Sequence, residues 1–384
     1  MQLILTILLG AVAAVWIIQS ARAYWGMKRL PRLADAAPAL TDPTPSVSIL
    51  FAARDEAAKL PAALASLLSQ DYQRYEVIAA NDRSRDDTGK ILEEASRAHA
   101  RLKVVHVDTL PAGWLGKTHA LARAYRQASG EWLIFTDADV RFAPDLVTRA
   151  MSLAHRDRLD HLTLMGLLEL RGFWEKVATL YFGVGFAFGV ETWRVPDPRS
   201  RRYMGVGYFQ MVRRSAYEAV GTHRRLALEV VDDMKLGKLV KLAGFCCGVG
   251  IAEERIRLRW NEGLRETIRN VEKNFFAALG FRVARTVMSV GGLLALSVLP
   301  FLALLLTTGP AQLLAGIAAA TAAGMHAWAA HHSRVSRWYG LTHPLGALVF
   351  CYMLLRSMVV TLWHGGVTWR DTFYPLDELR KGAV

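Results

Sequence analysis

The spacing of apolar and polar positions predicts a region of alternating strands and helices in the middle of the chain. Short apolar runs bounded by polar turn residues alternate with segments in which apolar residues recur at a helical period. Strands are predicted at SVSILFAA, YEVIAA, KVVHV and EWLIFTDAD, and helices at 57–69, after NDRSRDDT and at 117–128. Such alternation is typical of βαβ units, so the pattern predicts an α/β fold with a mainly parallel sheet.

Long apolar runs at both ends of the chain predict membrane helices. We expect an N-terminal anchor at 1–24, a central domain at 45–281, membrane helices within 285–364 and a tail at 365–384. The C-terminal helices are expected at 286–306, 311–330 and 344–363. Arg356 falls within the last of these, where a charge costs about 2.5 to 3.5 kcal/mol. It is expected to snorkel, to pair, or to mark a helix that lies at the interface.

Composition and charge agree with a membrane protein whose central domain is cytoplasmic. The chain of 384 residues is 52% hydrophobic. No positive charge precedes the first apolar run, whereas Arg22, Lys28 and Arg29 follow it. The positive-inside rule therefore places the central domain on the cytoplasmic side of the inner or plasma membrane. The alternative is a secretory signal cleaved near Ala21-Arg22-Ala23. Three cysteines cannot form a disulfide framework, which fits a reducing compartment.

The net charge of +13 predicts anionic partners. The arginine clusters have no recognisable nucleic-acid module around them, so an anionic lipid surface explains them better. The apolar run 177–190 would cover only about 21 Å as a helix, less than the hydrocarbon core of about 30 Å. We therefore expect a buried or interfacial helix there. WEKVATLYF and NEGLRETIRNVEKNFFAALGF likewise have one apolar and one charged side, as surface-lying amphipathic helices do.

Acidic residues follow three of the predicted strands. Glu56 follows the first, Asp82 the second, and Asp137 and Asp139 end EWLIFTDAD. The carboxyl ends of parallel strands form the edge at which ligands bind in α/β sheets. Asp137 and Asp139 point the same way because strand side chains alternate faces, and a divalent cation carrying a diphosphate would relieve their repulsion. The alternative is a solvated turn, where Asp is common.

An ordered set of motifs resembles a membrane-bound family 2 glycosyltransferase. The motifs are SILFAARDE, NDRSRDDT, GWLGKTHALARA, FTDAD and EVVDDMKLGKLVKLAG, within about 46–261. In these motifs the chain is similar to enzymes that glycosylate hydrophobic acceptors, such as hopanoid, carotenoid and ceramide glycosyltransferases. The resemblance implies a GT-A fold, which is Rossmann-like with a mainly parallel sheet. It also implies a nucleotide-diphosphate sugar donor, with a lean to uridine, and an inverting single displacement.

The resemblance also implies roles for individual residues. The expected donor-binding residues are Ala53, Glu56, Asp82, Lys117 and Asp137. Asp82 matches the aspartate that contacts the base, and Lys117 matches a lysine near the nucleotide. Asp137 and Asp139 match the Asp-x-Asp that meets the ribose and the metal-bound diphosphate, so Mg²⁺ or Mn²⁺ is the expected cofactor. A cation there would neutralise the charge that develops on the leaving diphosphate.

The acceptor hydroxyl is a poor nucleophile at neutral pH and needs a carboxylate base within hydrogen-bond reach. Asp232 and Asp233 fill the family's acidic pair, whose second member is the base, so Asp233 is the expected base. The first member is usually Glu, and Asp232 at that position leaves the choice between the two open. The alternative is that the pair caps the helix MKLGKLVKLAG, because Asp is favoured at helix N-termini.

Arg259 and Trp260 match the end of the QxxRW signature of processive polysaccharide synthases. Ile256 stands at the glutamine position, which argues against polymerisation. Arg259 and Trp260 are candidates for contact with the diphosphate or the acceptor, and an interfacial Trp-Arg belt is the alternative. Gly205 and Gly207 predict a flexible loop near the acceptor or ordinary turns.

These observations favour transfer of a single sugar to the hydroxyl of a membrane lipid. Two further functions stay open, namely processive synthesis and translocation of a polysaccharide, and donor binding without catalysis. The expected partners are a nucleotide sugar, a lipid acceptor and the membrane.

Overall fold

The computed structural model describes residues 2–36, 44–382 and 384, and it divides into two compact units. The sheet unit comprises Leu30–Glu169, Thr192–Arg259 and Lys381–Val384. The helical unit comprises Met1–Arg29, Leu170–Glu191 and Trp260–Arg380. The chain thus passes repeatedly between the units.

The sheet unit is built around an eight-stranded sheet, counted over the described residues, in the order β3-β2-β1-β4-β7-β6-β8-β5. The strands are β1 (Val47–Ala53), β2 (Tyr75–Asp82), β3 (Leu102–Val107), β4 (Trp132–Asp137), β5 (Arg141–Phe142), β6 (His161–Leu168), β7 (Gln210–Arg213) and β8 (Cys247–Leu258). The four strands predicted from the pattern, β1 to β4, are parallel neighbours. β7 runs antiparallel to β4 and β6, and β5 antiparallel to β8. The expected α/β fold with a mainly parallel sheet is confirmed.

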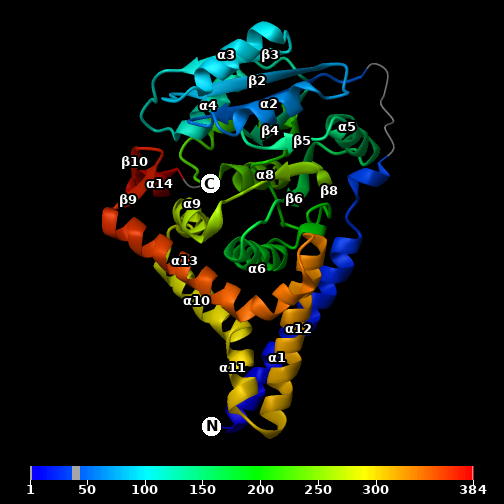
Figure 1. The fold of residues 1–384 in the computed structure, drawn as a ribbon, viewed down its shortest axis with the longest axis vertical. Helices are drawn as coiled ribbons and strands as arrows, with labels where there is room; N and C mark the ends of the chain where they lie inside the picture. The colour runs from blue at the N-terminus through cyan, green and yellow to red at the C-terminus, as the bar shows by residue number, and fades with distance from the viewer. Residues whose placement is uncertain (1, 37–43, 383) are drawn as a thin grey trace. The chain divides into compact units, whose positions relative to one another are not determined.

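Helices cover this sheet because each presents an apolar stripe to strands that are buried on both faces. They are α2 (Leu60–Leu68), α3 (Thr88–Ala98), α4 (Gly116–Tyr125), α5 (Leu146–Arg156), α7 (Arg214–Ala219) and α8 (Asp232–Leu242), with the short 3₁₀ turns η1 (Leu33–Asp35), η2 (Thr192–Arg194) and η3 (Thr222–Arg224). α4 packs on β1 and β2 (Figure 1). The helices expected at 57–69 and 117–128 are present with slightly shorter bounds.

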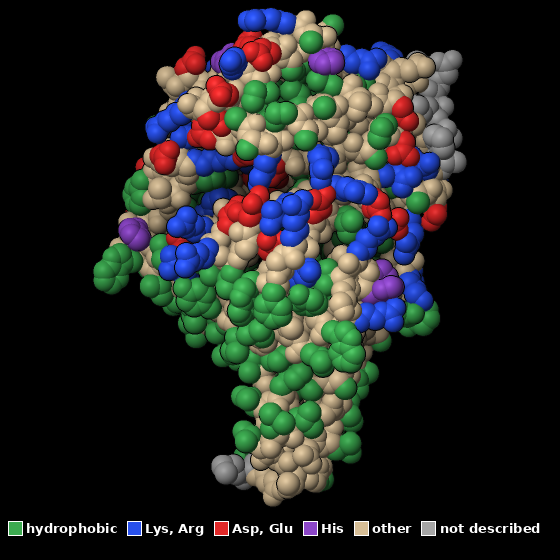
Figure 2. Space-filling model, in the orientation of Figure 1, with side chains coloured by type: hydrophobic (Ala, Val, Ile, Leu, Met, Phe, Trp, Pro, Cys, Tyr) green, Lys and Arg blue, Asp and Glu red, His purple; other side chains and the backbone are tan. Residues whose placement is uncertain are grey.

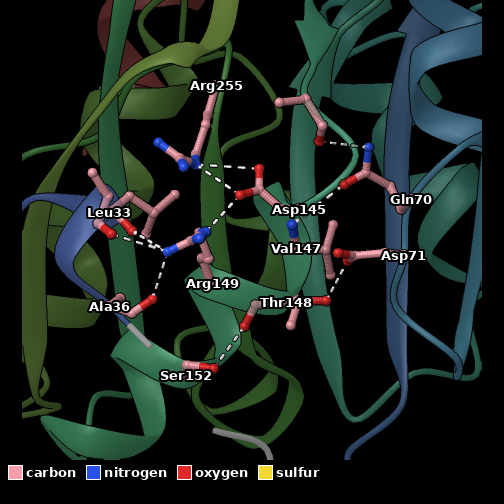
Figure 3. Close-up of polar contacts among 12 residues, drawn as sticks. Leu33, Ala36, Gln70, Asp71, Asp145, Val147, Thr148, Arg149, Ser152 and Arg255 are labelled. Atoms are coloured by element: carbon pink, nitrogen blue, oxygen red, sulfur yellow. Dashed lines mark hydrogen bonds and ion pairs between the residues drawn. The ribbon is translucent and has the colours of Figure 1, made fainter. Parts of the chain in front are cut away.

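Segment 30–36 is part of the sheet unit. Leu33 is fully buried in the core, and the amide of Ile251 in β8 donates to the Pro31 carbonyl at 2.9 Å. Arg149 of α5 donates from one nitrogen to the carbonyls of Leu33, Ala34 and Ala36 at 3.4, 3.0 and 2.8 Å (Figure 3). The guanidinium therefore adds charge-assisted hydrogen bonds to the backbone hydrogen bonds that this irregular segment already makes.

Arg149 is itself held in place by an acidic neighbour. Its Nε atom lies 2.5 Å from Asp145, and the same carboxylate accepts hydrogen bonds from Arg255 of β8 at 3.1 and 3.2 Å (Figure 3). Two guanidinium groups facing one carboxylate lower the pKa of Asp145, although burial alone would raise it. The network thus links α5, β8 and segment 30–36.

The helical unit consists mainly of long apolar helices. They are α1 (Gln2–Lys28), α6 (Phe173–Val190), α9 (Gly263–Ala278), α10 (Val283–Ser297), α11 (Leu299–Leu306), α12 (Gly309–His332) and α13 (His343–His364), with the 3₁₀ turn η4 (Arg337–Thr342) between the last two. Over the described residues, α1, α12 and the stretch Arg337–His364 are long and apolar enough to cross a membrane. α1 lies along α12 (Figure 1), and the surface of this unit in Figure 2 is dominated by hydrophobic side chains.

The span expected at 286–306 is divided in the structure. α10 ends at Ser297, and α11 begins at Leu299 with Pro300 in its first turn. Proline lacks the amide hydrogen that a continuous helix needs and its ring clashes with the preceding turn, so the helix breaks there. α9 and α10 form a bent pair, turned by 114°, which passes the same length and hydropathy test when taken together.

Arg356 pairs with an acidic residue. Its Nε atom lies 2.7 Å from Oε2 of Glu272 in α9. Next to this ion pair, the hydroxyl of Ser357 donates to the Glu272 carbonyl at 2.5 Å and accepts the Phe276 amide at 2.9 Å. Of the three alternatives for Arg356, the structure therefore shows pairing, and the pair fixes α13 against the amphipathic helix α9.

The stretch predicted only as a tail is folded from 366 to 381. β9 (Gly366–Trp369) and β10 (Thr372–Pro375) form an antiparallel hairpin, and α14 (Leu376–Lys381) follows. The two turn residues, Arg370 and Asp371, have φ of 46° and 64°. This left-handed pair is the backbone of the type I′ turn that matches strand twist in two-residue hairpins. Lys273 of α9 lies 4.1 Å from the Trp369 ring and holds the hairpin by a cation–π contact.

Candidate functional site

The acidic residues predicted to meet at one sheet edge do so. Asp82 ends β2, Asp137 ends β4, and β1, which leads into Glu56, lies between these two parallel strands. Burial, together with the nearby charges of Asp137 and Glu56, raises the pKa of Asp139 to about 6. Lys59 Nζ, at 3.9 Å from Oδ2 of Asp139, opposes this shift. The site thus holds crowded carboxylates with one flanking cation.

The first turn of α4 joins the ends of β2 and β4. A Cβ on Gly116 would lie 2.6 Å from Oδ2 of Asp82, so only glycine allows this approach. The next residue, Lys117, places Nζ 2.8 Å from Oδ1 of Asp137. Burial favours the neutral amine, but the charges of Asp137, Asp232 and Asp233 outweigh it and raise the pKa of Lys117. Lys117 is therefore a half-buried ammonium that pairs with Asp137 and is also influenced by the charges of Asp232 and Asp233.

The loop that follows β1 is braced by the loop that follows β2. The amide of Glu56 donates to Oγ1 of Thr88 at 2.8 Å, and the amide of Ala57 donates to Oδ2 of Asp86 at 3.0 Å. Asp82, which is buried, pairs with Arg83 at 2.8 Å. These bonds fix Glu56 and Asp82 before any ligand arrives, as a preorganised binding site requires.

Asp232 and Asp233 form the first turn of α8, and Val231 is the N-cap residue, so the pair lies within the helix rather than at its cap. Burial raises the pKa of Asp233, while Lys117 and backbone hydrogen bonds from Met234 and Gly207 oppose the shift. The Met234 amide lies 2.7 Å from Oδ1 of Asp233. The charges of both carboxylates, placed by the first turn of a helix, raise the pKa of Lys117.

Gly205 and Gly207 pack between the acidic groups. A Cβ on Gly205 would lie 2.0 Å from the Asp233 carbonyl oxygen, and one on Gly207 would lie 2.7 Å from Oδ2 of Asp137. Neither residue has a positive φ, so no left-handed turn requires glycine here. Close approach is the reason for both glycines, and it brings the backbone of 205–207 between Asp137 and Asp233.

Three polar residues of this region were not predicted. Lys59 flanks Asp139, as described above. Gln210 lies 2.9 Å from Nε2 of His161 and donates to the Asp233 carbonyl at 3.1 Å. His223 lies with Nε2 3.9 Å from Oδ2 of Asp232. A glutamine within the apolar run YFQMV was the available signal for Gln210, whereas nothing around His223 in the sequence distinguishes it from a loop residue.

Ala53, Arg259 and Trp260 are the remaining predicted site residues. Ala53 ends β1 and is fully buried, so only its backbone can meet a ligand. Arg259 is the last residue of the sheet unit before the chain enters the helical unit. Trp260 packs in the helical unit, with its ring centroid 5.0 Å from that of Phe182. Ile256, at the glutamine position of the QxxRW signature, is fully buried in the core.

Among the described residues, no three His, Cys, Asp or Glu side chains are grouped as a protein-only metal site requires. Mg²⁺, however, is commonly held by one or two carboxylates together with substrate phosphates and water. Asp139 and Asp137 supply hard oxygen donors, and a cation would offset both the burial and the neighbouring charges of Asp137 and Glu56 that raise the pKa of Asp139. These residues therefore fit a divalent cation that arrives with a diphosphate.

Comparison with known proteins agrees with this arrangement. Residues 48–221 match the family model described as glycosyl transferase family 2. Over 197 residues the chain is 26% identical to the 4,4'-diaponeurosporenoate glycosyltransferase of Staphylococcus haemolyticus, covering 51% of each chain. It is also 26% identical over 276 residues to the beta-monoglucosyldiacylglycerol synthase of a Synechocystis species, covering 65% of this chain and 55% of the relative. The chain thus spans about half the length of the curated relatives it matches.

A solved structure shows the same fold. The mannosyltransferase of Pyrobaculum calidifontis, determined with GDP-Man and Mn2+, superposes with a TM-score of 0.58 at 19% identity. The superposition covers 94% of this chain and 99% of that chain. The GT-A fold implied by the sequence motifs is therefore confirmed.

Proposed function

We propose that this protein transfers a single sugar from a nucleotide-diphosphate donor to the hydroxyl of a hydrophobic membrane acceptor, starting from the premise that residues 48–221 form a glycosyl transferase family 2 domain. The observation that carries the proposal is the Lys117 ammonium, which lies 2.8 Å from Asp137 at the sheet edge and whose pKa the charges of Asp137, Asp232 and Asp233 raise. A structural ion pair needs one carboxylate. Three carboxylates at the binding edge of an α/β sheet are typical of a site that binds phosphates and their counter-ion.

The donor is held by the braced loops at this edge. The backbone at Ala53 and the side chain of Glu56 bind the nucleotide, Asp82 contacts the base, and Lys117 lies near the diphosphate. Asp137 meets the ribose, and Asp139 with Asp137 would hold Mg²⁺ or Mn²⁺. That cation, when bound, neutralises the charge on the leaving diphosphate. Uridine is the expected base, because the sequence motifs resemble those of enzymes that use it.

The acceptor is activated by Asp233. The acceptor hydroxyl oxygen forms a bond to the anomeric carbon, its proton passes to the Asp233 carboxylate, and the bond from that carbon to the diphosphate oxygen breaks with inversion. Burial raises the pKa of Asp233, which makes its carboxylate a stronger proton acceptor than an exposed aspartate. Arg259 and Trp260 are proposed to contact the diphosphate or the acceptor.

A lipid acceptor is supported by the helical unit. Three of its helices are long and apolar enough to cross a membrane, and the two relatives named above act, by their names, on a carotenoid acid and a diacylglycerol. The amphipathic helix α9 and the apolar helix α6 would lie at the membrane surface. The positive-inside rule puts the sheet unit on the cytoplasmic side of the inner or plasma membrane.

Radiolabelled nucleotide sugars test the proposal. Membranes that contain the protein are incubated with each donor and Mg²⁺ or Mn²⁺, and the products are extracted with organic solvent. We expect label in a small extractable lipid. Label in an insoluble polymer would favour a processive synthase, and donor binding without any product would favour a non-catalytic binding protein.

Asp233→Asn tests the base in the same assay. We expect transfer to be abolished while nucleotide-sugar binding persists, because the amide keeps the shape but cannot accept the proton. Asp160→Asn is the matched control, since Asp160 pairs with Arg213 at 3.1 Å and lies outside the site. Full activity of Asp233→Asn would show that another group is the base.

A further inference from the structure

Two polar side chains are in contact within the sheet, next to the first turn of α8. His161 in β6 and Gln210 in β7 are 1% and 2% exposed. In the pairing of these strands Thr163 lies opposite Gln210, and His161, two residues before Thr163, points to the same face of the sheet. Nε2 of Gln210 lies 2.9 Å from Nε2 of His161 and 3.1 Å from the backbone carbonyl oxygen of Asp233.

The Asp233 carbonyl determines the direction of both hydrogen bonds. A carbonyl oxygen can only accept, so the Gln210 group that faces it is the NH₂ group. The second hydrogen of this NH₂ group is donated to His161, whose Nε2 atom is therefore an acceptor. Burial lowers the pKa of His161 to about 4, in agreement with a neutral ring. The ring hydrogen is consequently on Nδ1, which has no hydrogen-bond partner among the described residues.

Stability alone does not explain this pair of polar side chains. A buried N–H group without a partner is uncommon, because nothing compensates for its desolvation. Apolar side chains at 161 and 210 would remove that cost, and the Asp233 carbonyl would keep its place in the hydrogen-bond ladder of α8. The pair is better explained by the position in which it holds the backbone at Asp233.

The loop at 204–208 is tied to the same sheet by two hydroxyl groups. Thr163 in β6 donates from Oγ1 to the carbonyl of Met204 at 3.2 Å. Thr136 in β4 donates from Oγ1 to the carbonyl of Tyr208 at 2.8 Å. Both ends of the loop are thus fixed by side chains that bond to its backbone.

Gln210 lies where this loop meets α8. A Cβ on Gly205 would lie 2.6 Å from Nε2 of Gln210 and 2.0 Å from the Asp233 carbonyl oxygen, so the loop, the amide and the helix turn are closely packed. The backbone of Gly207 bonds to the Asp233 carboxylate, and a Cβ on Gly207 would lie 2.7 Å from Oδ2 of Asp137. A shift of the helix turn against the loop would therefore move the carboxylate of Asp233 relative to that of Asp137.

We propose that Gln210, supported by His161, is a positioning residue for the transfer reaction, an inference that rests on the function proposed above. Its amide sets the first turn of α8 against the loop at 204–208, and in this way it fixes the Asp233 carboxylate relative to Asp137. Misplacement of a reacting group by about 1 Å can lower a rate by about two orders of magnitude. Neither Gln210 nor His161 lies in the motifs that carry the family resemblance.

Gln210→Met tests the inference, because methionine has a similar length but cannot donate a hydrogen bond. The transfer rate is measured per folded molecule in detergent. We expect kcat to fall about tenfold or more while the donor KM changes less than about threefold, since the donor-binding loops stay in place. Adding His161→Leu should lower kcat no further, because residues that act through one another are not additive. A normal kcat for Gln210→Met, with Asp233→Asn inactive, would overturn the inference and leave the proposed function standing.

Gln70→Met is the matched control. Gln70 is buried in the same unit, and its amide also donates to two backbone carbonyls, those of Ser66 and Ala143 at 2.8 and 3.1 Å. It lies outside the site, so its loss should lower Tm and leave kcat per folded molecule unchanged. Gln210→Met should lower kcat more than it lowers Tm. If both variants lowered Tm alone, Gln210 would have only a packing role and the inference would be wrong.

A spectroscopic measurement tests the contact even if the protein transfers no sugar. The imidazole nitrogens of ¹⁵N-histidine-labelled protein are observed in detergent, and the His161 signals are assigned by their absence in His161→Leu. We expect a neutral ring protonated at Nδ1, and loss of this preference in Gln210→Met. A charged ring, or a ring protonated at Nε2, would refute the inference independently of the proposed function.

Discussion

Lys117 Nζ lies 2.8 Å from Oδ1 of Asp137, and this contact joins the first turn of α4 to the end of β4. The ammonium is half-buried, and the charges of three carboxylates raise its pKa although burial alone would lower it. Next to it, Gly116 of α4 leaves no room for a side chain beside Asp82 of β2, because an added Cβ would lie 2.6 Å from Oδ2 of Asp82. One helix N-terminus therefore sets the spacing between the two strand ends at which the donor is proposed to bind.

Replacement of Lys117 by Met should leave the three carboxylates uncompensated. We expect the free energy of unfolding to fall by about 3 kcal/mol and transfer to fall by about two orders of magnitude. Thermal unfolding and the radiolabel assay measure these effects. Arg156→Gln, which removes the exposed ion pair with Asp157, should cost less than about 1 kcal/mol. Similar effects of the two variants would contradict the central role given to Lys117.

The two close-approach glycines should differ when each is changed to alanine. Gly205→Ala places a methyl group 2.0 Å from a backbone oxygen, which cannot move easily, so we expect a loss of stability of about 2 kcal/mol or more. Gly207→Ala meets a side-chain oxygen of Asp137, which can rotate, so we expect lost transfer with nearly normal unfolding. Gly185→Ala in α6 has open space around it and serves as the control. The reverse order of the two effects would refute the packing argument.

Glu76 should make stability depend on acid pH. Burial would raise its pKa, but hydrogen bonds from Lys103, Ser48 and Ser129 outweigh burial and lower it to about 2. The pKa of Glu76 in the unfolded state is 4.5, so the folded state binds fewer protons between the two pKa values. The stability that this adds is complete above pH 4.5 and is lost as the pH falls through 2. We expect this contribution to be on the order of 1–2 kcal/mol after solvent screening.

The measurement compares Glu76→Gln with the unmodified protein by thermal unfolding in detergent from pH 7 to pH 2. The difference in Tm should be largest at pH 7 and should approach zero near pH 2. Glu131→Gln, at an exposed ion pair with Arg213, should show no such trend. A Tm difference for Glu76→Gln that stays constant with pH would rule out the assigned shift.

Removing only one residue of the ion pair between Glu272 and Arg356 should cost more stability than removing both. Glu272→Gln leaves the arginine of an apolar helix without its carboxylate, and we expect a loss of about 2.5 to 3.5 kcal/mol. The double variant Glu272→Gln with Arg356→Leu should recover most of that loss, because an uncompensated charge is no longer present. Unfolding in detergent or bicelles measures both. A double variant no more stable than Glu272→Gln would argue against the pairing.

The parallel half of the sheet was predictable because its strands alternate with helices along the chain. β1 to β4 and the acidic residues at their ends followed from local pattern and motif order. The second half was not, because β7 lies between β4 and β6 although it follows both in sequence. Such pairing depends on contacts far apart in the chain, which periodicity does not report.

Within the site, the positions of the charged residues were predictable from the sequence, whereas the packing contacts were not. The spacing of Asp137 and Asp139 marked a binding edge, but nothing marked His223, which is buried against Tyr217. Gly205 and Gly207 looked like turn residues, yet their φ angles are negative and contact explains them. Hydropathy alone treats the run around Val298 as continuous. The break in the helix there can be predicted only if the effect of Pro300 is considered as well.

The interleaving of the two units has a consequence for the order in which the protein is made. The chain passes from one unit to the other at 29/30, 169/170, 191/192, 259/260 and 380/381. On the ribosome, β1 to β6 emerge before α6, and β7 and β8, which complete the sheet next to β4 and β6, emerge only after it. During that interval β4 and β6 have open edges, and such edges favour aggregation. The translation interval around α6 is therefore the stage of biogenesis at which this protein most needs a chaperone or rapid membrane engagement.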